Sequence, residues 1–78
     1  MDPHNLVGMA NRIGEFFGAM PDRAEALEGV ATHLSKYWAP RMRRQILAQL
    51  DRGEAAGLSD LVREALVAYR ATLDPGPG

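Results

Sequence analysis

Few residues of this chain have side chains that could do chemistry. Its two histidines, His4 and His33, lie on separate segments, and neither has a carboxylate or a second histidine at a metal-ligand spacing. There is no cysteine, which excludes thiolate ligands and disulfides. Ser35 and Ser59 lie outside any strand–turn–helix elbow that would expose a nucleophile. The sequence therefore predicts no catalytic residue, no cofactor-binding residue and no metal ligand.

Composition narrows the classes of function further. Ten acidic and nine basic residues give a net charge of −1, whereas nucleic-acid-binding domains usually carry a basic excess that neutralises phosphates. Gly8, Gly14 and Gly18 are spread along one helical pattern and do not form a phosphate-binding loop. No apolar run approaches the ~20 residues of a membrane-spanning helix. We expect a cytoplasmic protein that binds neither nucleic acid nor a membrane.

The sequence predicts four amphipathic helices, which must position any functional surface of the chain. Apolar residues recur at three- and four-residue steps in segments of about 5–19, 23–38, 40–52 and 60–73. The predicted apolar faces are Leu6, Met9, Ala10, Ile13, Phe16, Phe17 and Met20; Leu27, Val30, Ala31, Leu34, Tyr37 and Trp38; Met42, Ile46, Leu47 and Leu50; and Leu61, Val62, Ala65, Leu66, Tyr69 and Leu73.

The ends of these helices have recognisable signals. Asp22 and Ser59 are suited to cap the second and fourth helices, Pro40 suits the first turn of the third, and Gly53 suits its end. The pattern predicts an all-α fold, either a small four-helix bundle or an orthogonal helical array. Residues 1–73 form the single domain, and the Pro/Gly-rich residues 74–78 form a flexible tail.

A stripe of small side chains on the first helix is more than folding requires. Val7, Asn11, Gly14 and Gly18 fall within about 60° of each other, away from the predicted apolar face. Interior helix glycines cost up to ~1 kcal/mol each relative to alanine. Random accumulation of glycines in a helix of marginal stability, without any function, would explain these residues equally well. The functional interpretation is a docking groove, either internal or intermolecular.

The second such feature runs from Tyr37 to Arg44. Tyrosine, tryptophan and arginine are enriched at interface hot spots, and arginines at the start of a helix oppose its dipole. Arg43 falls beside the apolar face, so its stem should pack while its guanidinium reaches out. A solvated basic turn paired with nearby acids is the plain alternative. The predicted partner-binding residues are Asn11, Gly14, Gly18, Tyr37, Trp38, Pro40, Arg41, Arg43 and Arg44.

Two strings of residues resemble a known family. They are Met9-Ala10-Asn11-Arg12-Ile13-Gly14-Glu15-Phe16-Phe17 with Ala19-Met20-Pro21-Asp22-Arg23, and His33-Leu34 with Trp38-Ala39-Pro40-Arg41-Met42-Arg43-Arg44. They resemble the delta subunit of soluble, NAD-dependent, molybdenum-containing formate dehydrogenases. The resemblance covers about residues 5–70. Glu54-Ala55-Ala56 stand where the family is often richer in glycine.

The resemblance implies a role within a larger enzyme. In such complexes an alpha subunit oxidises formate at a molybdopterin guanine dinucleotide centre, iron–sulfur clusters carry the electrons, and a flavin (FMN) subunit reduces NAD. The delta subunit is expected to be a non-catalytic accessory that docks on the alpha subunit, beside beta and gamma subunits, and supports assembly, cofactor maturation or stability. A maturation chaperone that dissociates from the apo-enzyme and a small helical nucleic-acid-binding regulator remain as alternatives.

Overall fold

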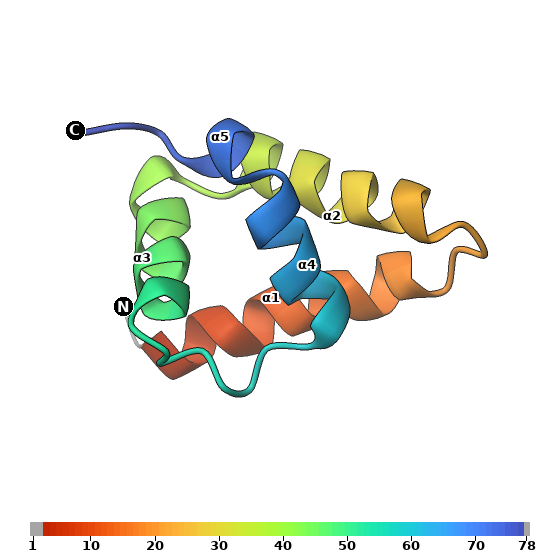
Figure 1. Ribbon diagram of the computed structural model, residues 1–78, viewed down its shortest axis with the longest axis horizontal. Helices are drawn as coiled ribbons and strands as arrows, with labels where there is room; N and C mark the ends of the chain where they lie inside the picture. The colour runs from red at the N-terminus through yellow and green to blue at the C-terminus, as the bar shows by residue number, and fades with distance from the viewer. Residues whose placement is uncertain (1–2, 78) are drawn as a thin grey trace.

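The computed structural model describes residues 3–77, and over that range the chain has five helices and no strand (Figure 1). The helices are α1 (Pro3–Gly18), α2 (Arg23–Tyr37), α3 (Pro40–Asp51), α4 (Asp60–Ala68) and α5 (Arg70–Leu73). The predicted all-α fold is confirmed. Residues 1, 2 and 78, at the ends of the predicted domain and tail, lie outside the described residues.

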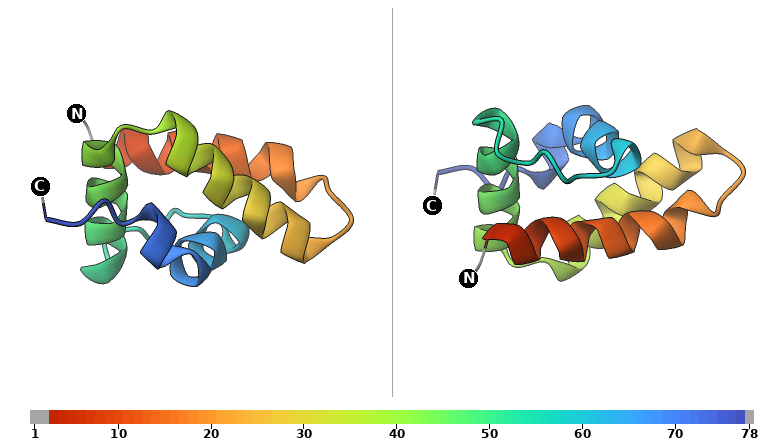
Figure 2. Two further views of the ribbon diagram at one scale, coloured as in Figure 1. Left: turned by 90° about the horizontal axis from the view of Figure 1, so that it is seen from above. Right: turned by 90° about the horizontal axis from the view of Figure 1, so that it is seen from below.

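The helices pack as an array and not as an up-and-down bundle. α1 and α2 form an antiparallel hairpin. α3 crosses this hairpin at a steep angle, at the end that holds the start of α1 and the end of α2 (Figures 1 and 2). α4 packs against both helices of the hairpin, and α5 returns the chain to α2. The far end of the α1–α2 hairpin extends beyond the other helices (Figure 1).

The predicted helix ends are confirmed by their hydrogen bonds. The Asp22 carboxylate accepts from the backbone N–H groups of Ala24 at 2.9 Å and Glu25 at 3.4 Å, and the Ser59 hydroxyl accepts from Val62 N–H at 3.3 Å. Pro40 is the first residue of α3. The predicted fourth helix differs in one respect, because it is broken at Tyr69 (φ −111°, ψ 25°) into α4 and the single turn of α5.

One apolar core joins all five helices. Its largest fully buried side chains are Leu6, Val30, Leu34, Ile46, Val62, Leu66 and Leu73. Leu73 belongs to it although α5 has only four residues. Burial of this side chain fixes α5 against the rest of the domain, because exposing a leucine costs about 1.5–3 kcal/mol.

Three side chains of the predicted apolar faces are exposed instead: Phe16, Met20 and Tyr37. Phe16 is 74% exposed and Tyr37 is 73% exposed. On α1 the buried positions are Leu6, Ala10 and Gly14, so the buried face is turned by about 60° from the predicted one. Phe16 lies about 120° from the centre of this face. It thus lies about 160° around α1 from Gly14, the residue that contacts Val62 of α4.

Candidate interaction surfaces

The stripe of small residues on α1 is an interface within the domain. Gly14 is buried, and a Cβ atom on it would lie 2.6 Å from Val62 Cγ2 and 3.2 Å from Ser59 Oγ. Val7 packs partly buried against the core. The glycine therefore lets α4 approach α1 closely. Of the two predicted alternatives for the stripe, an internal or an intermolecular groove, Gly14 fits the internal one, because the buried face of α1 is turned toward it.

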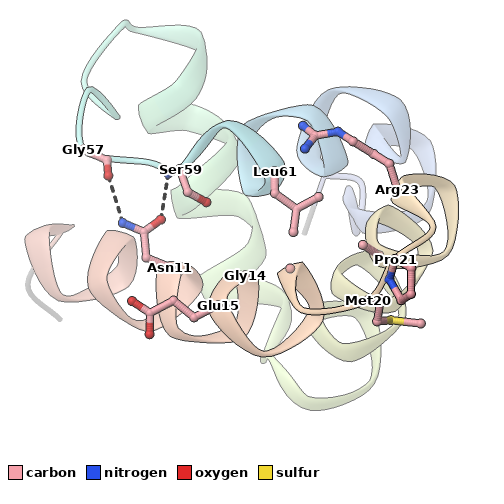
Figure 3. Close-up of a pocket in the computed structure, with 11 residues that line it drawn as sticks. Asn11, Gly14, Glu15, Met20, Pro21, Arg23, Gly57, Ser59 and Leu61 are labelled. Carbon is pink, nitrogen blue, oxygen red and sulfur yellow. Dashed lines mark hydrogen bonds between the residues drawn. The ribbon is translucent and has the colours of Figure 1, made fainter.

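Asn11 connects α1 to the loop that precedes α4. Its Nδ2 donates to the Gly57 carbonyl at 2.8 Å, and its Oδ1 accepts from Ser59 N–H at 2.9 Å (Figure 3). Both ends of the amide are thus used inside the chain. Gly18 is exposed, one turn beyond Gly14. Asn11 and Gly14 position α4, which is a structural role.

A groove of about 490 Å³ lies between α1, the α1–α2 turn and the start of α4 (Figure 3). Its lining residues are Asn11, Gly14, Glu15, Gly18, Met20, Pro21, Arg23, Ala26, Gly57, Ser59 and Leu61. The Arg23 guanidinium pairs with Glu64 at 2.7 Å. No histidine lines the groove, and within residues 3–77 no three acidic or histidine side chains are grouped to hold a metal ion. The groove does not bring together an acid–base pair or a nucleophile with its base.

Trp38 is a core residue. Only 6% of it is exposed, and it belongs to the same buried cluster as Leu34 and Leu47. Its backbone is extended (φ −88°, ψ 131°) at the end of α2, where the chain turns into α3. Its indole is thus covered by this chain, so Trp38 has a structural role in the core, and its contact with a partner stays a prediction. Pro40, which follows it, is exposed at the start of α3.

The three arginines of α3 face different surroundings. Arg41 is exposed, and Arg43 is half-buried. Arg43 Nη1 donates to the Leu73 carbonyl at 3.3 Å, while its Nε is buried and has no acceptor within the described residues. Arg44 Nε donates to the Gly76 carbonyl at 3.3 Å. The predicted packing of the Arg43 stem agrees with its half-buried position.

Ion pairs in the described part of the chain do not include these arginines. They join Arg23 to Glu64, Arg52 to Glu54 and Arg70 to Asp51. The last pair has two hydrogen bonds, and the bonds and charge of Arg70 lower the pKa of Asp51 below its ordinary value. Within residues 3–77 the start of α3 is thus a basic turn without a carboxylate partner.

An aromatic surface lies on the α1–α2 hairpin, and no residue of α4 lines it. We define the aromatic surface as Arg12, Ile13, Phe16, Phe17, His33 and Tyr37, which line a groove of about 460 Å³. The rings contact in sequence: Phe16 and Phe17 edge to face at 5.0 Å between centroids, Phe17 and His33 at 6.2 Å, and His33 and Tyr37 at 4.8 Å. Tyr37 is the only predicted partner-binding residue in this set.

Gly29 on α2 determines how the aromatic surface is built. A Cβ atom at this position would lie 2.4 Å from Cδ1 of Phe17 and 2.6 Å from Cε1. The Phe17 ring therefore lies directly on the α2 backbone, and its flat contact fixes the ring beside His33. Phe16, its neighbour in sequence, is left pointing to solvent.

Sequence reasoning missed most of the aromatic surface. The sequence shows no metal-ligand partner for His33, and its periodicity predicts that Phe16 and Phe17 both belong to the apolar face of the first helix. A signal was present: adjacent residues on a helix point about 100° apart, so Phe16 and Phe17 cannot both face one narrow core. His33 and Tyr37 are four residues apart and share a face of α2.

No helix within residues 3–77 combines the length and the apolar character needed to cross a membrane.

No curated protein and no solved structure gives a significant match to the chain. A family model does match: the NADH-dependent formate dehydrogenase delta subunit FdsD, over residues 5–66. The match covers most of α1, all of α2 and α3, and most of α4, with both strings that carry the resemblance. The chain therefore belongs to the family of NADH-dependent formate dehydrogenase delta subunits.

Proposed function

We propose that this delta subunit is a non-catalytic accessory of its formate dehydrogenase, and that it docks on the molybdenum-containing alpha subunit to support assembly, cofactor maturation or stability. In this proposal the other subunits, alpha, beta and gamma, carry the molybdopterin guanine dinucleotide, the iron–sulfur clusters and the FMN, and NAD is their substrate. This chain binds none of them. The complex works in the cytoplasm.

The observation that carries the proposal is the aromatic surface. Phe16 and Tyr37 expose most of their area beside Phe17 and His33. Single exposed apolar residues are ordinary, but contiguous apolar patches on small soluble domains are typical of protein contacts. Aromatic side chains contribute strongly to such contacts because each buries a large area with little loss of conformational freedom. Covering the two exposed rings would stabilise a complex by several kcal/mol, on the order of 25 cal/mol per Å².

The test replaces the two exposed rings in the full chain. Phe16→Ser together with Tyr37→Ser should reduce co-purification with the alpha subunit at least about tenfold, because truncation of interface hot spots typically costs 2 kcal/mol or more each. Folding should be unaffected, since surface substitutions usually change stability by about 0.5 kcal/mol or less. Val67→Ser is the matched control, because Val67 is also an exposed apolar side chain (64%) but lies on α4, outside the aromatic surface.

Normal co-purification of the double variant would show that the aromatic surface is not the docking site. A second measurement separates a resident subunit from a maturation factor. The ratio of delta to alpha subunits should be equal in cofactor-loaded and cofactor-free enzyme if the delta subunit is resident. An excess in the cofactor-free enzyme would instead support a chaperone that leaves after cofactor insertion.

A further inference from the structure

The C-terminal residues lie over the basic start of α3. α5 ends at the buried Leu73, and the tail then runs without helical structure across α3 (Figure 2, left). Two hydrogen bonds join the segments, from Arg43 Nη1 to the Leu73 carbonyl and from Arg44 Nε to the Gly76 carbonyl, each 3.3 Å long. In the free chain, backbone carbonyls of the C-terminal residues thus accept the hydrogen bonds of Arg43 and Arg44.

These hydrogen bonds use little of what the arginines offer. A guanidinium has five N–H donors, arranged so that two of them bind one carboxylate side by side. Arg43 makes one long bond to a neutral acceptor, and its Nε is buried with no acceptor in the described residues. A buried donor of a charged group without an acceptor is costly. The surroundings of Arg43 and Arg44 therefore suit an anion with two oxygens better than they suit the tail.

The tail is weakly held beyond Leu73. The Asp74 carboxylate accepts from Gly76 N–H within the tail itself, and the hydrogen bond described between residues 74–77 and α3 is the one from Arg44. The family match ends at residue 66, so it includes all three arginines of α3 and excludes the tail. Moving residues 75–77 away from α3 would leave Leu73 in the core and would free the Nε–H of the already exposed Arg44.

We propose that an acidic segment of the partner subunit replaces residues 74–77 on α3, and that its carboxylates bind Arg44 and Arg43. The exposed Arg41 lies in the same turn and adds positive charge. The chemistry of the occupant follows from charge complementarity, since no carboxylate within residues 3–77 pairs with these arginines. The identity of the partner rests on the proposed function; the preference for carboxylates does not.

The experiment uses a fluorescent hexaglutamate peptide as the probe and measures its anisotropy with the full chain. Arg44→Gln should weaken binding about tenfold, the effect of losing one charge-assisted contact. The matched control Arg52→Gln should bind within about twofold of the unchanged chain, because Arg52 pairs with Glu54 elsewhere. A chain ending at Asp74 should bind about threefold more tightly, since the tail no longer competes.

Three results would overturn the inference. The first is absence of hexaglutamate binding up to about 1 mM. The second is that either variant, Arg44→Gln or the chain ending at Asp74, binds hexaglutamate as tightly as the unchanged chain does. The third is tighter binding of a short DNA duplex than of hexaglutamate through the same arginine, which would assign the basic turn to nucleic acid.

Co-purification distinguishes this inference from the proposed function. If the unchanged chain binds hexaglutamate through Arg44 but does not associate with the alpha subunit, the proposed function fails and the carboxylate site stands. If the chain associates with the alpha subunit, but Arg44→Gln and the shortened chain both associate like the unchanged chain, the proposed function stands and the exchange of tail for partner fails.

Discussion

Two glycines of α1 provide a controlled test of how α1 and α4 pack. Gly8 and Gly14 both lie in the interior of the helix, so alanine at either position should gain up to ~1 kcal/mol of helix propensity. Their surroundings differ. A Cβ on Gly8 meets nothing within 4 Å, whereas a Cβ on Gly14 lies 2.6 Å from Val62 Cγ2. Comparing the two variants isolates the steric cost at the helix contact.

The magnitude follows from this contact. Carbon atoms pack at about 3.5–4.0 Å, so alanine at position 14 falls short by roughly 1 Å. Val62 is fully buried and β-branched, so it cannot rotate out of the way cheaply. The helices must separate, and overpacking of this kind costs about 1–3 kcal/mol. Gly8→Ala should be stabilised by about 0.5–1 kcal/mol, and Gly14→Ala should be about 1–3 kcal/mol less stable than Gly8→Ala.

The assay is thermal and urea unfolding followed by helical circular dichroism. For a domain of this size 1 kcal/mol moves the midpoint by about 4–8 °C, so the two variants should be clearly separated, with Gly8→Ala above the unchanged chain. Equal stabilities of Gly8→Ala and Gly14→Ala would refute the close approach of α4 to α1. They would also indicate that the stripe of small residues on α1 does not pack against α4.

Other variants test other parts of the structure. Asn11→Ala should cost about 1–2 kcal/mol by removing two hydrogen bonds to the loop before α4, and hydrogen exchange should rise in that loop; unchanged exchange there would contradict the role. Because Arg70 lowers the folded-state pKa of Asp51, the ion pair should stabilise the chain above the ordinary carboxyl pKa and lose its effect as pH falls through the folded value. The difference in thermal midpoint between the unchanged chain and Asp51→Asn should thus be present at neutral pH and should vanish as the pH falls through the lowered pKa of Asp51; a difference independent of pH refutes this. Gly29→Ala should push the Phe17 ring off α2, changing the ring-current shifts of nearby protons in NMR spectra, and identical shifts would mean that the ring does not rest there.

Local signals in the sequence predicted the helices and their ends. Asp22, Ser59 and Pro40 act through contacts with residues two to four positions away, which is why their roles could be assigned without the fold. The class all-α follows from the same local periodicity. The array could not be chosen over the bundle, because crossing angles depend on which side chains meet between helices.

The outward surfaces were harder to predict, for a physical reason. Trp38 and Phe16 have similar apolar character, yet Trp38 is buried and Phe16 is exposed. What separates them is the position of each on the fold: Trp38 lies where α2 meets α3, and Phe16 lies on the side of α1 opposite Gly14, which contacts α4. Periodicity gave the width of the apolar arc on α1, but only the contact of Gly14 with Val62 determines its direction.

The most direct test of the account is the exposure of Phe16 and Tyr37 in the assembled enzyme. Hydroxyl-radical footprinting of the free chain should oxidise both rings readily, since each exposes nearly three quarters of its area. In the purified formate dehydrogenase complex both should be strongly protected, while Val67, also exposed in the free chain, should keep its reactivity. Equal oxidation of Phe16 and Tyr37 in the free chain and in the complex would contradict docking through the aromatic surface.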